Sequence, residues 1–145
     1  MHSIRSLPNR FAFQVPMAAA LGLALLWAFA LPGAVLGQEP WQAPPEYDGY
    51  ANPIKADGDS IAKGKAVYLK NCFLCHGEKG DGKGPSAGTM PVKPSAFTDK
   101  MVQSQSEGSL AFKILSGRGP MPAWAPILQE DEVWNVINYI RQFGK

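Results

Sequence analysis

Two thiols and one imidazole lie within a short stretch of this sequence. The chain has two cysteines, Cys72 and Cys75, and His76 follows directly in the run CFLCH. Residues three and four positions apart share one face of a helical turn, so these side chains can meet one flat group from the same side. C-x-x-C-H is typical of covalent haem attachment, in which the histidine is the proximal iron ligand. The motif predicts one haem c held by Cys72 and Cys75, with His76 on the iron.

The same cysteine pair has two alternative interpretations. It could form a redox-active disulfide or supply half of a zinc site. A zinc site would need two more ligands, and the other histidine of the chain, His2, lies in the N-terminal segment. A thioredoxin-like disulfide is expected beside alternating strands and helices, and the sequence shows no strand pattern. Haem attachment therefore fits the sequence best.

The second axial ligand is expected to be a methionine, from Met90, Met101 or Met121. Met121 stands out because it lies in the run Gly-Pro-Met-Pro at residues 119–122. Prolines fix the local backbone and reduce the entropy that is lost when a loop is ordered. A weakly binding thioether would benefit from such a loop. Met121 is the predicted iron ligand, with Met90 as the next alternative and an open site as the last.

The N-terminal segment has the pattern of an export signal. A basic start with Arg5 and Arg10 is followed by residues 11–37, which carry no charge. This layout is typical of a secretory signal peptide, but the 19 apolar residues at 18–36 approach the roughly 20 needed to span a bilayer. We expect residues 1–37 to be a signal peptide or a membrane anchor. The protein would be exported, to the periplasm or the outer face of the cytoplasmic membrane, and would contact the membrane only if residues 15–37 are retained as an anchor.

The remaining chain divides by composition into an arm and a domain. Residues 38–57 contain four prolines, which argue against a helix, and three aromatic residues, which favour docking over a free linker. Residues 58–145 are predicted to form one compact domain. A core this small usually needs a cross-link or a cofactor.

Apolar residues recur at helical spacing in three stretches of this domain. The first predicted helix is capped by Asp59 or Ser60 and runs towards Cys72, the second covers about residues 106–116, and the third covers about residues 130–143. The loop at residues 77–105 shows no periodic pattern, and a loop of this length in a small domain usually wraps a ligand. The predicted fold class is all-α, preceded by the N-terminal signal or anchor helix.

From about residue 59 to residue 145, the sequence resembles the class I cytochrome c family. Gly64 and Tyr68, before CFLCH, and Tyr139, in the last predicted helix, resemble the residues where the first and last helices of that family cross. Gly84-Pro85 resembles the segment whose proline carbonyl accepts the imidazole N–H, which would give Pro85 this role and fix the ring of the ligand. The segment around Met121 resembles the family's distal methionine loop.

The resemblance implies a small cytochrome c fold, with three main helices and long loops around one covalent haem with His and Met ligands. It implies electron transfer in a respiratory or periplasmic redox chain, with a redox protein donor and acceptor or a larger oxidoreductase or oxidase complex as partners. Without residues 1–37, the chain carries 12 basic and 12 acidic residues, which argues against nucleic acid. A peroxidase-like haem enzyme is the alternative, but it would want a distal histidine or arginine, and His76 is the one histidine after residue 37.

Overall fold

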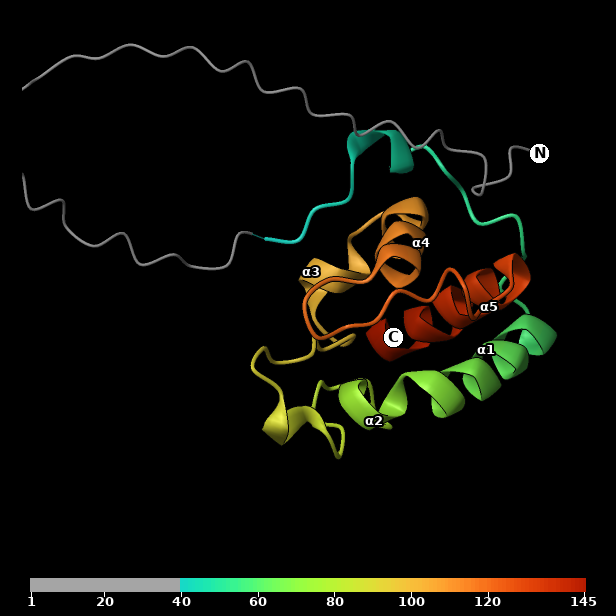
Figure 1. Cartoon of the computed structure of the whole chain (residues 1–145). Coiled ribbons are helices and arrows are strands. Elements are labelled where there is room, and N and C mark those ends of the chain that lie inside the picture. Colours follow the sequence, from blue (N-terminus) through green and yellow to red (C-terminus); the bar gives the residue numbers. More distant parts are fainter. Residues whose placement is uncertain (1–39) are drawn as a thin grey trace, which may run out of the picture. The chain divides into compact units, whose positions relative to one another are not determined.

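The structure, a computed structural model, describes residues 40–145 (Figure 1). This part of the chain is helical and contains no β-strand, which confirms the predicted all-α class for it. The α-helices are α1 (Gly58–Asn71), α2 (Phe73–His76), α3 (Lys100–Gln103), α4 (Glu107–Ser116) and α5 (Glu130–Ile140), and short 3-10 helices cover Pro45–Tyr47, Ala87–Thr89 and Arg141–Gly144. Within residues 40–145, no helix is long and apolar enough to cross a membrane. The predicted signal or anchor lies outside the described residues.

Helices α1 and α5 lie side by side, and α5 also packs against α4 (Figure 1). They approach most closely at Gly64, where an added Cβ atom would overlap the backbone carbonyl of Asn135 and touch the Cβ of Tyr139. Tyr68, one turn further along α1, is fully buried, and its ring meets that of Tyr139 edge-on at 5.3 Å. The crossing that the resemblance implied for these residues is present in the structure.

We expect Gly64→Ala to destabilise the domain, because a methyl group cannot fit without moving one helix. Overpacking of this kind typically costs about 1–3 kcal/mol of unfolding free energy, which chemical denaturation would measure. Gly58→Ala, at the start of the same helix, is the matched control, since nothing lies within 4 Å of a Cβ atom added there. Equal denaturation midpoints for the two variants would contradict the close crossing.

Two of the predicted helix boundaries are wrong. Helix α1 is capped by Asp57, whose carboxylate accepts a hydrogen bond from the Ser60 amide at 3.0 Å. The predicted caps, Asp59 and Ser60, therefore lie inside the helix, and the sequence offered three good capping residues within one turn. The last helix ends at Ile140, and the chain then tightens into the 3-10 helix Arg141–Gly144.

The long loop after the CFLCH motif, residues 77–105, is also more structured than predicted. It contains the 3-10 helix Ala87–Thr89 and the short helix α3. The end of α3 is tied to the C-terminal helix by Arg141, whose guanidinium donates to the carbonyl oxygens of Gln103 at 2.8 Å and Gln105 at 2.6 Å. Helix α4 agrees with the prediction and begins after Ser106, whose hydroxyl caps it.

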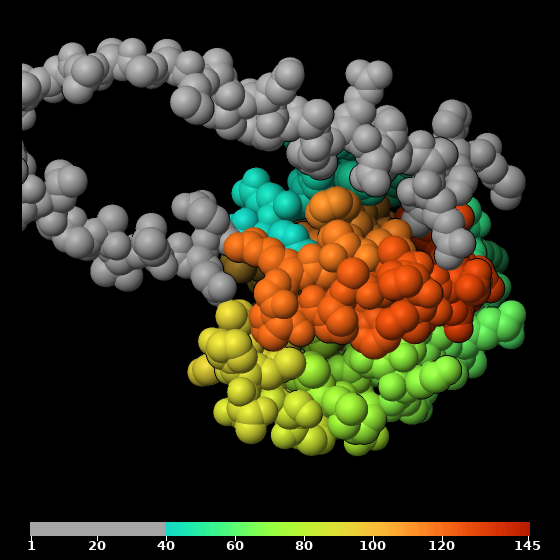
Figure 2. Space-filling model, viewed as in Figure 1, coloured from blue at the N-terminus to red at the C-terminus, as the bar shows by residue number. Residues whose placement is uncertain are grey.

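Residues 40–57, called the N-terminal arm below, lie against α4. The rings of Tyr47 and Phe112 are 4.6 Å apart, and the Asp48 carboxylate accepts hydrogen bonds from the hydroxyls of Ser106 at 2.8 Å and Ser109 at 2.7 Å. In the space-filling view, cyan residues of the arm adjoin orange residues of α4 (Figure 2). These contacts favour a docked arm over a free linker.

Asn52 fastens the arm to α5. Its side-chain amide donates to the carbonyl oxygen of Trp134 at 3.1 Å and to the side chain of Asn138 at 2.9 Å. The buried amide of Asn138 in turn donates to the carbonyl oxygen of Ile54 at 3.0 Å and to the Ser60 hydroxyl at 2.8 Å. One polar network thus joins the arm, α1 and α5.

Asn52→Ala is expected to loosen the arm and destabilise the domain. Leaving a buried polar atom without a partner typically costs about 1–3 kcal/mol, and here the side-chain oxygen of Asn138 would lose the hydrogen bond from Asn52. Denaturation would measure the loss, and trypsin should cut faster after Lys55, which lies in the arm. Gln42→Ala, at an exposed arm position, is the control. Unchanged stability and cleavage in Asn52→Ala would contradict the docking described here.

Candidate cofactor site

A cavity of about 850 Å³, measured out to its open mouth, lies between α2, the loop before α3, α4 and the loop before α5. Apolar side chains dominate its walls: Val92, Pro94, Phe97, Ile114, Pro120, Pro122, Trp124, Leu128 and Ile140. Such a lining suits a flat, mostly apolar group.

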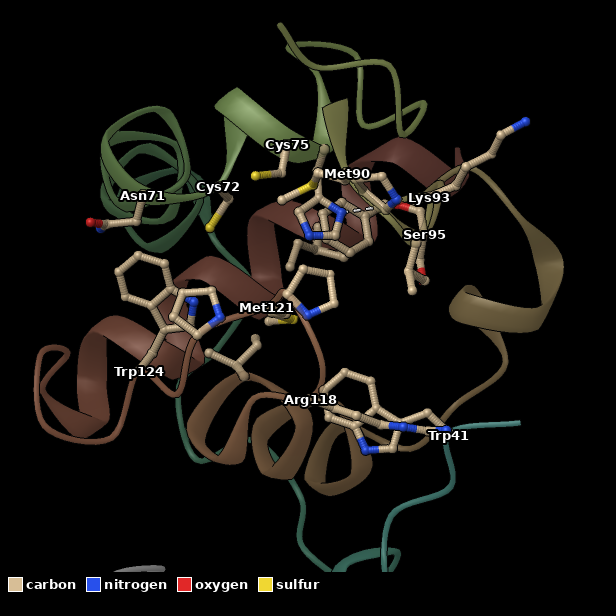
Figure 3. A pocket seen from close by; sticks show the side chains of 18 of the residues that line it. Trp41, Asn71, Cys72, Cys75, Met90, Lys93, Ser95, Arg118, Met121 and Trp124 are labelled. Carbon is tan, nitrogen blue, oxygen red and sulfur yellow. Dashed lines mark hydrogen bonds between the residues drawn. The ribbon is translucent and has the colours of Figure 1, made fainter. Parts of the chain in front are cut away.

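Both cysteines of the motif line this cavity, and both are free thiols (Figure 3). Burial, with a smaller effect of the neighbouring Cys75, raises the pKa of the Cys72 thiol to about 12. A neutral thiol that becomes a neutral thioether fits this environment, whereas a zinc site would require buried thiolates. Among residues 40–145, no group of three or more His, Cys, Asp or Glu side chains could hold a metal ion. The donor set therefore fits haem better than zinc.

His76, at the end of α2, also lines the cavity and is held in one orientation. Its Nδ1 atom lies 3.0 Å from the carbonyl oxygen of Ser95. Because a carbonyl can only accept, Nδ1 carries the proton, and Nε2 keeps its lone pair for a metal. Burial lowers the imidazole pKa, although the bond to Ser95 opposes this. The ring stacks on Phe97, with centroids 4.3 Å apart.

The structure corrects the prediction that the carbonyl oxygen of Pro85 accepts the imidazole N–H of His76, because the carbonyl oxygen of Ser95 has this position instead. Pro85 is exposed and does not line the cavity. The segment that follows Pro85 instead binds the backbone of α2, because the Ser86 amide donates to the carbonyl oxygen of Leu74 at 2.8 Å. Ser95 was missed because a backbone acceptor can come from any residue type.

The structure separates the three candidate methionines. Met101 is 79% exposed and does not line the cavity, whereas Met90 and Met121 do. Figure 3 shows Met90 beside Cys75, while Met121 lies deeper in the cavity, on the loop before α5. Met121 exchanges backbone hydrogen bonds with Arg118, of 3.2 Å and 3.1 Å, which close a tight turn. Met121 therefore enters the cavity wall from the loop between α4 and α5, whereas His76 comes from α2.

Trp41, Phe97 and Arg118 are among the lining residues that were not predicted. The aromatic content of the arm was a signal that it docks, but not that Trp41 would reach the cavity. Phe97 lies in a loop without a periodic pattern, so its stacking on His76 could not be predicted. Arg118 lies in no motif that the sequence singles out.

Several known proteins are similar to this chain in sequence. The family model described as cytochrome C oxidase, cbb3-type, subunit III matches residues 59–140. The cbb3-type cytochrome c oxidase subunit CcoP of Azospirillum brasilense is 31% identical over 100 residues, which cover 68% of this chain and 34% of that protein. Cytochrome c6 of Cladophora glomerata is 30% identical over 84 residues, which cover 58% of this chain and 89% of that protein.

A solved structure is also similar. A chain of the Kuenenia stuttgartiensis reducing HAO-like protein complex Kustc0457/Kustc0458 superposes with a TM-score of 0.59 at 30% sequence identity. The match covers 68% of this chain and 49% of that chain. The likeness therefore extends to the fold as well as to the sequence.

The helices, the CFLCH motif and the apolar cavity are those of a class I c-type cytochrome domain. The chain belongs to the cytochrome c oxidase, cbb3-type, subunit III family. It spans about a third of the length of the CcoP relative and most of the cytochrome c6 relative. This kinship with c-type cytochromes implies haem c and haem-based electron transfer.

Proposed function

We propose that this chain carries single electrons through one haem c, attached covalently to Cys72 and Cys75, with His76 and Met121 as its axial ligands. The observation that supports this most is that both thiols, the imidazole and the Met121 thioether line one apolar cavity. A haem there would supply an iron that exchanges one electron, and axial methionine would raise its potential.

The protein's own groups would orient and shield the site. The hydrogen bond to Ser95 fixes the His76 ring and increases its donor strength. The turn between Arg118 and Met121 holds the thioether loop, which is tied to α4 where the Trp124 amide donates to the carbonyl oxygen of Ile114 at 3.2 Å. With two protein ligands in place, no coordination position is left for a substrate. The proposed role is therefore that of a carrier rather than of an enzyme.

The proposed partners are a redox protein donor and acceptor, or the other subunits of an oxidase complex in a respiratory or periplasmic chain. The family match and the CcoP relative support the second form, and the cytochrome c6 relative, matched over 89% of its length, supports the first. Copurification from native membranes would distinguish a permanent subunit from a shuttle.

Redox spectroscopy tests carrier against enzyme. We expect a reversible one-electron titration, low-spin spectra in both oxidation states and poor binding of carbon monoxide by the ferrous protein at neutral pH. A high-spin ferrous protein that binds carbon monoxide readily would show an open iron site. It would favour the peroxidase-like alternative over the carrier.

Export is proposed from residues 1–37, which lie outside the described part of the chain. We expect N-terminal sequencing of the protein from its native host to begin near Gln38, as for a cleaved signal peptide. Recovery of chains that begin at Met1 in carbonate-washed membranes would instead establish an anchor. A full-length chain in the cytoplasmic fraction would contradict export in either form.

A further inference from the structure

Trp41 and Arg118 form the part of the cavity wall farthest from the cysteines. Figure 3 shows Cys72 and Cys75 at one end of the cavity, and Trp41 and Arg118 beside each other at the other end. The guanidinium carbon of Arg118 lies 6.0 Å from the centre of the Trp41 ring. This distance is at the limit of a cation–π contact. The arm thus supplies part of the cavity wall through Trp41.

A second cation lies over the same ring. The Nζ atom of Lys113, on α4, is 5.7 Å from the centre of the Trp41 ring and donates a hydrogen bond to Gln105. Burial and then the nearby Arg118 lower the pKa of Lys113, and Asp48 acts in the opposite direction. Two cations therefore gather around one arm tryptophan, and their combined field favours an anion at this end of the cavity.

The chemistry of haem places anions there, if the proposed function holds. The vinyl groups and the two propionates lie towards opposite edges of the porphyrin. Thioethers to Cys72 and Cys75 would fix the vinyl edge at the cysteine end of the cavity. The propionates would then extend towards the end formed by Trp41 and Arg118.

We propose that Trp41 and Arg118 form the propionate end of the haem site, which makes the N-terminal arm a functional part of that site. Arg118 donates hydrogen bonds to a propionate, as guanidinium groups do to carboxylates. Trp41 covers the same end from solvent, and Lys113 holds its ring through the cation–π contact. Trp41 is therefore a positioning residue that shields the charge pair.

This arrangement favours the reduced haem. A cation near the iron stabilises the ferrous form, which carries one positive charge less than the ferric form, and exclusion of water strengthens that effect. Removal of the Arg118 charge or of the Trp41 cover should therefore lower the reduction potential. We expect about a tenfold change in the redox equilibrium constant, which corresponds to about 59 mV for a one-electron couple.

The test compares holoprotein variants by reduction potential and by the resonance Raman bending mode of the propionates, which responds to their hydrogen bonds. Arg118→Gln and Trp41→Ala should lower the potential and shift this mode, while Trp41→Phe should stay near the unmutated protein. Lys100→Gln removes an exposed lysine that does not line the cavity and should change neither readout. Arg118→Gln leaves the arm intact, so it tests the site even if Trp41→Ala folds poorly.

Unchanged potential and Raman mode in Arg118→Gln would overturn the propionate site. A lower potential together with loss of the near-infrared sulfur-to-iron band would also overturn it, because the effect would then act through the Met121 loop. Haem content is measured in parallel by intact mass. Absence of covalent haem from the unmutated protein would refute the proposed function, whereas normal haem with unaffected variants would refute this inference alone.

Discussion

Met121→Ala is expected to abolish the near-infrared sulfur-to-iron charge-transfer band of the oxidised protein and to lower its reduction potential. The sulfur ligand favours ferrous iron, and axial ligands set haem potentials over roughly 0.8 V. We expect a fall on the order of 0.1–0.2 V, together with new carbon monoxide binding at the opened position. The fold should largely survive, because His76 and two thioethers would still hold the haem.

Two methionines serve as controls for this result. Met90→Ala changes a residue that lines the same cavity beside Cys75, and Met101→Ala changes one that is 79% exposed. Both variants should keep the band. Loss of the band in Met90→Ala but not in Met121→Ala would move the ligand to the other loop while leaving an electron carrier in place.

The double variant Cys72→Ala/Cys75→Ala is expected to lose all covalent haem. Both thioethers would be removed, and the small helical core would keep a cofactor only through weaker axial bonds. When the variant is made in a periplasm that matures c-type cytochromes, its yield of stable holoprotein should be low. Acid–acetone should extract any haem that remains.

The single variants Cys72→Ala and Cys75→Ala are the matched controls. Each should keep one thioether and therefore part of its haem after extraction. Haem that resists extraction from the double variant would show that attachment does not use these thiols.

The parts that the sequence could predict are those in which residue type and spacing carry the chemistry. For Cys72, Cys75 and His76, the C-x-x-C-H spacing predicts three reactive groups on one helical face, and the structure brings all three to one cavity. The crossing at Gly64 could be expected from the resemblance to the class I cytochrome c family, and a Cβ atom added at Gly64 would overlap the backbone of Asn135. The paired prolines around Met121 likewise marked a rigid loop.

The parts that were missed depend on tertiary contacts and on the backbone. The carbonyl oxygen of Ser95 lies within hydrogen-bond distance of the His76 imidazole. Because every residue has a backbone carbonyl, no residue type in the sequence distinguished Ser95 from the predicted Pro85. Helix α3 has four residues, which is too short for apolar residues to recur at helical spacing. The reach of Trp41 into the cavity depends on where the arm docks, which Asn52 and Asp48 determine through partners far away in sequence.

Covalent haem attachment can be measured by intact mass spectrometry of the native protein, with acid–acetone extraction of the same sample. We expect the mass of the mature chain plus one haem, with the haem retained on the polypeptide after extraction. A polypeptide with no added mass, and a haem that passes into the acetone, would contradict covalent attachment through Cys72 and Cys75.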